Sequence, residues 1–184
     1  MHQWVYYNVR NPAWVITSGC DTPIENLSSF VEKHCKIVVN SISCRVQDTR
    51  HMLNIVDDLN SIGVSEQDIL VSFDIINMFP SNDNQLGIER FRTKLIEFSH
   101  CFDVPVECIV EALEICLKNN CSKYREQYWL QGNGTAMGPK NSCSYADIVA
   151  EFIDTEVLKS RQVYPELRCW FRFRDDTFVF KEGR

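Results

Sequence analysis

Two adjacent aspartates, Asp175 and Asp176, lie between two runs of aromatic and β-branched residues near the end of this 184-residue sequence. Such runs favour strands, so the sequence predicts a β-hairpin over 167–181 with both carboxylates at its tip. Neighbouring carboxylates repel each other, and stability alone gives a hairpin no reason to place both there. A pair of bound divalent cations gives such a reason.

A third carboxylate, Asp74, lies in the apolar run 69–75, which is typical of a strand covered on both sides. One aspartate on this strand and two at a hairpin tip can hold two Mg²⁺ ions about 4 Å apart, the geometry of phosphoryl and nucleotidyl transfer. We therefore predict that the three carboxylates converge, with Asp74 within about 8 Å of at least one hairpin carboxylate.

A glycine-rich segment at 132–138 precedes a helix that we expect to begin at Pro139 and to run to about Ser160. Glycine lets the backbone approach a ligand closely, and the free N–H groups at a helix start suit a phosphate or a polar sugar or base group. The residues alone leave two interpretations open, a ligand-binding loop and an ordinary glycine-rich connection.

The order of these parts resembles motifs A, B and C of the reverse transcriptase palm. The residues within the motifs most resemble those of the Penelope-like retroelement branch. The three motifs read Phe73-Asp74-Ile75-Ile76-Asn77-Met78-Phe79, Gly134-Thr135-Ala136-Met137-Gly138-Pro139 and Phe173-Arg174-Asp175-Asp176. Stretches at 14–27 and 46–54 resemble the fingers segment and the following helix of that branch. The resemblance covers about 10–181 and implies a retroelement RNA-directed DNA polymerase that acts on an RNA template, a DNA primer and dNTPs.

The same resemblance implies a metal centre. Asp74 and Asp175 would bind two Mg²⁺ ions, with Mn²⁺ as an alternative, and Asp176 would complete the cluster. The ions would activate the primer 3′-hydroxyl and hold the incoming triphosphate.

A nucleotide site is implied beside this centre. The backbone of 74–79, with Ile75, Ile76 and Asn77, would hold triphosphate oxygens. Phe79 would be the steric gate that excludes a ribose 2′-hydroxyl, although a buried turn aromatic is an alternative interpretation of this residue. Gly138 would pack under the templating base and sugar.

The fold implied is α+β, with a palm formed by a ferredoxin-like (RRM-like) antiparallel sheet backed by helices. The whole chain, 1–184, would be a partial reverse transcriptase domain: partial fingers and connecting helices over about 1–65, the palm with its three motifs over about 66–184, and no thumb.

Two positions depart from the family pattern. The fingers arginine that contacts the triphosphate aligns with Trp14, which cannot donate a charge-assisted hydrogen bond. Either Arg10 or Lys140 replaces it, or nucleotide binding is impaired. Arg174 occupies a position that is usually small or apolar in the family, and a cation there would compete with the metal.

Two other functions are considered. One is a non-catalytic remnant or protein-interaction module derived from a retroelement. The other is a different two-metal enzyme such as an RNA-dependent RNA polymerase. This alternative is disfavoured by Phe79 and by the Thr-Ala-Met residues of motif B.

Composition restricts the partners. The net charge of −6 leaves few cations to neutralise phosphates, so the isolated chain is expected to bind nucleic acid weakly. No apolar run is long enough to span a membrane, and no signal peptide is recognisable. The nine cysteines are scattered singly, without the paired spacing of a metal site. These features favour a single-domain intracellular protein, nuclear or cytoplasmic, with reduced thiols and no membrane partner.

The remaining elements follow from periodicity and capping residues. Thr22 is expected to cap a helix that ends near Ile42, and Asp48 a helix that ends at Gly63 with Met52, Leu53, Val56 and Leu59 on its apolar face. Cys108 and Cys116 are expected in the core. The other predicted elements are helices at 84–98 and 105–120 and strands at 3–9, 13–18 and 122–131.

Overall fold

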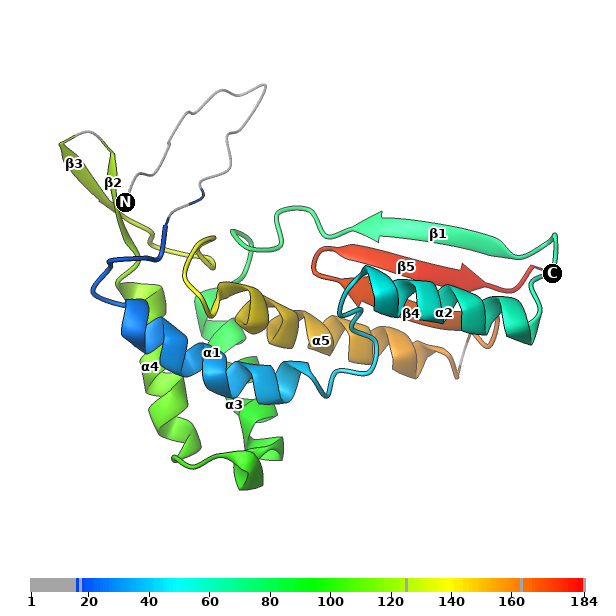
Figure 1. The fold of residues 1–184 in the computed structure, drawn as a ribbon, viewed down its shortest axis with the longest axis horizontal. Helices are drawn as coiled ribbons and strands as arrows, with labels where there is room; N and C mark the ends of the chain where they lie inside the picture. Colours follow the sequence, from blue (N-terminus) through cyan, green and yellow to red (C-terminus); the bar gives the residue numbers. More distant parts are fainter. Residues whose placement is uncertain (1–15, 17, 125, 163, 184) are drawn as a thin grey trace. The chain divides into compact units, whose positions relative to one another are not determined.

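The structure, a computed structural model, describes residues 16, 18–124, 126–162 and 164–183. These residues form α1 (Glu25–Val39), α2 (Thr49–Ile62), β1 (Ile69–Asp74), α3 (Asn84–Glu97), the short 3₁₀ helix η1 (Ser99–Cys101), α4 (Val106–Lys118), β2 (Cys121–Tyr124), β3 (Gln127–Leu130), α5 (Ser142–Ser160), β4 (Leu167–Phe173) and β5 (Asp176–Lys181) (Figure 1). Helices and antiparallel strands together confirm the predicted α+β class. The strand predicted at 3–9 and most of that at 13–18 lie outside the described residues.

The chain divides into two compact units. The first comprises Met1–Ser41 and Asn77–Val149, and the second comprises Ile42–Ile76 and Ala150–Arg184. Helices α1, α3 and α4, the β2–β3 hairpin and the first part of α5 belong to the first unit. Helix α2, strands β1, β4 and β5 and the last part of α5 belong to the second.

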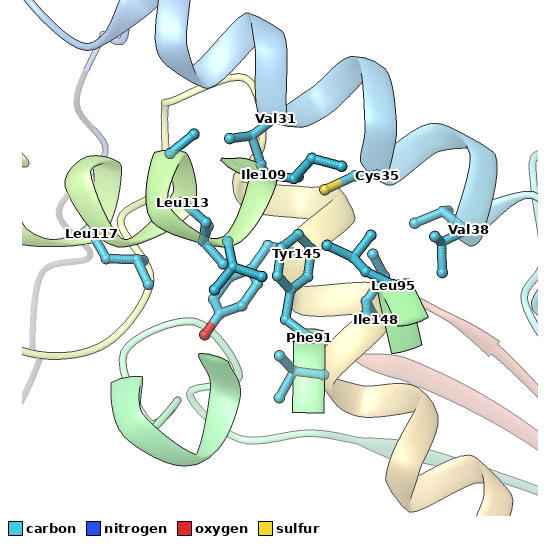
Figure 2. Packing of buried hydrophobic residues seen from close by; sticks show 14 residues of the cluster. Val31, Cys35, Val38, Phe91, Leu95, Ile109, Leu113, Leu117, Tyr145 and Ile148 are labelled. Atoms are coloured by element: carbon cyan, nitrogen blue, oxygen red, sulfur yellow. The ribbon is translucent and has the colours of Figure 1, made fainter. Parts of the chain in front are cut away.

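The first unit is built around a helical core. Side chains from α1, α3, α4 and the first turns of α5 pack together, and Figure 2 shows Val31, Ile109 and Tyr145 meeting between the helices. The ring of Tyr145 contacts that of Phe91 edge-on, with 5.7 Å between centroids. Burying each large apolar side chain contributes about 1.5–3 kcal/mol, so this cluster accounts for much of the stability of the unit.

The second unit is organised by a three-stranded antiparallel sheet in the order β1–β5–β4, with β5 between the other two strands (Figure 1). Because directly opposed residues share a face, the register assigns side chains to two sides. One face carries Trp170, Arg172, Thr177 and Val179, and the other carries Asp74 and Asp176. The last part of α5 lies against the first of these faces, since Asp154 bonds both Trp170 and Arg172.

The two helix starts that were predicted from capping residues differ in outcome. Asp48 caps α2 as predicted, and its side chain accepts the N–H of His51 at 2.8 Å. Thr22 does not cap α1, which begins at Glu25 after Ile24, and the Thr22 hydroxyl donates to the carbonyl of Gly19. None of the helices in the described part of the chain is long and apolar enough to cross a membrane.

Several local predictions were wrong. Strand β1 is an edge strand rather than a covered one, and it leaves Leu70 and Phe73 more than half exposed. Helix α5 begins three residues after Pro139, because residues 139–141 form a turn closed by the bond from the Ser142 N–H to the Pro139 carbonyl.

The expected core positions also need two corrections. On α2 the buried residue is Ile55, while Leu53 is exposed. Cys116 is buried as predicted, and burial raises the pKa of its thiol to about 11. Cys108 is exposed, because α4 turns its neighbours Ile109 and Val110 toward the core instead.

Replacing Gly87 by Ala is expected to destabilise the first unit by about 1–3 kcal/mol, as overpacking does elsewhere. A Cβ at this position of α3 would overlap the buried hydroxyl oxygen of Tyr145, for which the described part of the chain offers no hydrogen-bond partner. Thermal or urea unfolding measures the effect. The matched control is Gly132→Ala, where nothing lies within 4 Å of the added carbon. The double variant with Tyr145→Phe should recover most of the loss, and no recovery would contradict the assigned clash.

Candidate metal and nucleotide site

The predicted hairpin tip is a two-residue turn. Strand β4 ends at Phe173 and β5 begins at Asp176, and these two residues are paired, so Arg174 and Asp175 form the connection. Arg174 has φ 60°, a left-handed conformation that costs a side-chain-bearing residue about 1–3 kcal/mol unless its surroundings impose it. Backbone strain of this kind is concentrated at functional sites.

The structure brings the three aspartates to one end of the sheet. Asp74, the last residue of β1, lies directly opposite Asp176 in the register. Opposed residues of antiparallel strands have Cα atoms about 4.5–5.5 Å apart, and their side chains share a face. The ladder continues past Asp74, because the N–H of Ile75 donates to the carbonyl of Asp175 at 2.9 Å. Motifs A and C are therefore joined by backbone hydrogen bonds at the acidic end.

The chemistry of this end suits a hard cation, since carboxylate oxygens are the ligands that Mg²⁺ prefers. Asp74 and Asp176 are exposed and Asp175 is half-buried. In the described residues no group of three or more His, Cys, Asp or Glu side chains is arranged to hold a metal ion. The backbone pairing brings the three aspartates to the same end of the sheet, and their role as metal ligands stays a prediction.

The remaining nucleotide-site residues fall on both sides of the unit boundary. Ile75 and Ile76 follow β1 in the second unit, where Ile76 is 77% exposed. Asn77, Phe79 and Gly138 belong to the first unit. Asn77 has φ 57° and its carbonyl accepts the N–H of Ser81 at 2.9 Å.

Within the first unit, Phe79 lies against the motif B loop. Its carbonyl accepts the N–H of Thr135 at 2.8 Å, and Asn82 donates to the Thr135 hydroxyl at 3.0 Å. A Cβ on Gly134 would come within 2.5 Å of the Pro80 carbonyl oxygen, so only glycine permits this approach. The ring of Phe79 is half-buried, and it is not a core residue.

Gly138 is exposed at the other end of the same loop, with φ 142°. The residues near the start of the described chain hold it in place. Ile16 forms a parallel bridge with Met137, and the Gly138 carbonyl oxygen lies 2.8 Å from where a Cβ of Gly19 would be. The loop is therefore anchored by glycine-to-glycine contact as well as by the segment that carries Phe79.

Lys140, one of two candidates to replace the fingers arginine, is already paired. Its Nζ lies 3.2 Å from Oε1 of Glu25. The pKa of Glu25 is lowered first by the N–H of Asp21, which donates to this carboxylate, and then by Lys140. Binding a triphosphate through Lys140 would require this pair to open. Arg10 and Trp14 lie outside the described residues.

Sequence reasoning missed a buried ion pair behind the hairpin. The Nη2 of Arg172 lies 2.8 Å from Oδ2 of Asp154, and its Nε bonds both carboxylate oxygens at 2.9 and 3.1 Å. Both side chains are at most 1% exposed. The register of β4 with β5 sets Arg172 on the same face as buried Val179, and this pairing is not contained in the local sequence.

Two further donors satisfy Asp154. Trp170 Nε1 donates to Oδ1 at 2.8 Å, and the buried thiol of Cys44 also bonds the carboxylate. Burial, and next the negative charge of Asp154, raise the pKa of Cys44 to about 12, so the thiol remains a protonated donor. A buried carboxylate with this many donors is held in one position.

Comparison with known proteins gives a likeness of fold. No protein-family model and no curated protein sequence matches the chain. Among solved structures, apo telomerase from Candida tropicalis truncated from its C-terminal domain superposes with a TM-score of 0.66 at 15% identity, over 85% of this chain and 34% of that one. Telomerase from Candida albicans in complex with a TWJ fragment of telomeric RNA superposes with a TM-score of 0.65 at 9% identity, over 87% and 31%.

The chain thus spans about a third of the length of the telomerase chains that it matches. At these identities the likeness concerns the fold alone. The chain therefore has a reverse-transcriptase-like fold of the kind found in telomerase.

Proposed function

We propose that this chain is the fingers–palm part of an RNA-directed DNA polymerase, which transfers a nucleotide from a dNTP to a primer 3′-hydroxyl. The observation that carries the proposal is the register that sets Asp74 opposite Asp176 with Asp175 in the adjoining turn. The telomerase-like fold supports it, because telomerase is itself a reverse-transcriptase-family enzyme.

The three aspartates would hold two Mg²⁺ ions, Asp74 and Asp175 as shared ligands and Asp176 as an additional one. When bound, the ions would supply Lewis-acid activation of the hydroxyl and neutralise charge on the triphosphate. The protein would contribute the backbone pairing of β1 with β5, which sets Asp74 opposite Asp176. The oxygen-only donor set fits this role.

The nucleotide would lie along the segment that follows Asp74. Backbone groups of Ile75, Ile76 and Asn77 would hold phosphate oxygens, and the half-buried ring of Phe79 would exclude a ribose 2′-hydroxyl. Gly138, exposed and without a side chain, would lie beneath the templating base. Deoxynucleotides are thus the proposed substrate class.

We propose that the chain belongs to the Penelope-like branch of retroelements. The residues of motifs A and B and the stretches at 14–27 and 46–54 support this assignment. RNA template and DNA primer are the proposed partners. One neighbour with this fold is a complex with a telomeric RNA fragment, which agrees with a nucleic-acid role. The alternative, a non-catalytic remnant, keeps the fold but needs neither metal nor nucleotide.

The first measurement is the binding of a fluorescent RNA–DNA primer–template. We expect weak binding that falls about 10- to 100-fold as salt rises from about 50 to 200 mM, because the chain carries a net charge of −6 and neutralises few phosphates. Fluorescence anisotropy measures this dependence. Primer extension by these residues alone should be slight, since they neutralise few phosphates of the duplex.

The next complementary dNTP provides the decisive comparison. With Mg²⁺ present, it should tighten binding of the primer–template several-fold, because template, primer and nucleotide bind together in a polymerase site. A non-complementary dNTP is the matched control and should have no effect. Equal effects of the two nucleotides, or none from either, would favour the remnant.

A further inference from the structure

The buried Asp154–Arg172 pair reaches the strained turn directly. The Nη1 of Arg172 donates to the carbonyl of Arg174 at 2.9 Å. That carbonyl belongs to the peptide group that joins Arg174 to Asp175. The same guanidinium therefore bonds Asp154 through Nε and Nη2 and fixes the peptide from which Asp175 is presented.

The following peptide of the turn is fixed from the other side. The carbonyl of Asp175 accepts the N–H of Ile75, the residue after Asp74. Asp175 thus has one flanking peptide tied to the ion pair and the other tied to motif A. The two-residue hairpin turn itself requires the left-handed φ of Arg174, and the bonds to both carbonyls restrict rotation of the peptides on either side of Asp175.

Stability alone does not explain a buried pair of this kind. Replacing both members of such a pair by apolar residues of similar size is often neutral or stabilising, because the cost of removing two charges from water disappears. What apolar side chains cannot reproduce is the bond from Nη1 to the turn. In the register, Arg172 is on the opposite face of the sheet from Asp74 and Asp176.

We infer that Asp154 and Arg172 position Asp175 for cation binding, by holding the Arg174–Asp175 peptide in the conformation that brings Asp175 beside motif A. They are positioning residues and contact no reacting group. The purpose of this positioning, cation binding, rests on the proposed function, whereas the control of the turn by Arg172 does not.

The test uses the whole chain with two variants of the pair. Asp154→Leu with Arg172→Met removes both charges and should keep the fold. Arg172→Lys keeps a charge, but a single amine cannot bond Asp154 and the Arg174 carbonyl in the same geometry. Val179→Ala is the matched control, because Val179 is buried on the same face of the same sheet and lies far from the turn.

Two readouts are measured under conditions where each variant is folded. Hydrogen exchange of the Ile75 amide, followed by NMR, reports whether the turn remains bonded to motif A. Binding of Mn²⁺, followed by electron paramagnetic resonance, reports the carboxylate arrangement. In both pair variants we expect the Ile75 amide to exchange about tenfold faster and Mn²⁺ affinity to fall about tenfold. Val179→Ala should change each by less than about twofold, even where its stability loss is larger.

Normal Ile75 exchange in the folded double variant, or an equal loss in Val179→Ala, would overturn the inference. Failure of the proposed function looks different. It would appear as Mn²⁺ binding by the unaltered chain that Asp74→Asn does not weaken, and the Ile75 exchange would still decide whether Arg172 controls the turn.

Discussion

Replacing Asp175 by Asn should lower the rate of nucleotide addition by about 10³-fold or more, measured by single-turnover primer extension in a polypeptide that joins these residues to a thumb. The amide keeps the shape of the side chain but removes the negative charge that would hold both ions. A loss of about 4 kcal/mol of transition-state stabilisation corresponds to this factor. Asp74→Asn should have an effect of similar size, because Asp74 would share the same ions.

The matched control for these variants is Asp58→Asn. Asp58 is an exposed carboxylate of α2 in the same unit, outside the acidic end of the sheet. Circular dichroism and unfolding should show that all three variants are folded. Nucleotide addition by Asp175→Asn at more than a tenth of the unaltered rate would refute the two-metal assignment.

Replacing Phe79 by Val should reduce discrimination against ribonucleotides by about 10- to 100-fold, since a smaller side chain leaves space for the 2′-hydroxyl. The measurement is the ratio of kcat/KM for a dNTP to that for the matching ribonucleotide, in the same polypeptide. Addition of dNTPs should change little, because the backbone bond from Thr135 to the Phe79 carbonyl does not depend on the side chain.

Phe102→Val controls for a general loosening of the first unit. Phe102 is also half-buried and packs against the helical core. It should lower stability without altering the discrimination ratio. An unchanged ratio in Phe79→Val would mean that Phe79 is an ordinary turn aromatic, which was the alternative that the sequence left open.

The helix starts show how far local sequence determines structure. Asp48 could be predicted as a cap from its position before the apolar face of α2, and its carboxylate accepts the N–H of His51 as expected. Thr22 has the same capping pattern, yet its hydroxyl bonds Gly19, which lies beside Gly138 far along the chain. The capping pattern at Thr22 is therefore not used, and Gly19, the residue that Thr22 bonds, lies beside a glycine that is distant in the sequence.

The acidic site could also be predicted from the sequence only in part. The hairpin tip with Asp175 and Asp176 follows from the strand-forming residues on both sides of it, and the structure confirms that hairpin. The pairing of β1 with β5 joins distant segments, so only the chemistry of three carboxylates suggested it. Arg172 could not be predicted as buried, because its partner Asp154 lies on a helix and both residues resemble ordinary surface charges in the sequence.

The two-residue length of the turn has a consequence for insertions and deletions in this gene. Thr177 and Val179 are buried on the face of Arg172, so packing fixes the register of β5 from Thr177 onward. One codon inserted directly before Thr177 would place the new residue opposite Asp74 and move Asp176 into the turn. The sheet would survive such a change and the acidic cluster would not. In related sequences, in-frame length changes between Phe173 and Thr177 should therefore mark lineages that have abandoned the chemistry while keeping the fold.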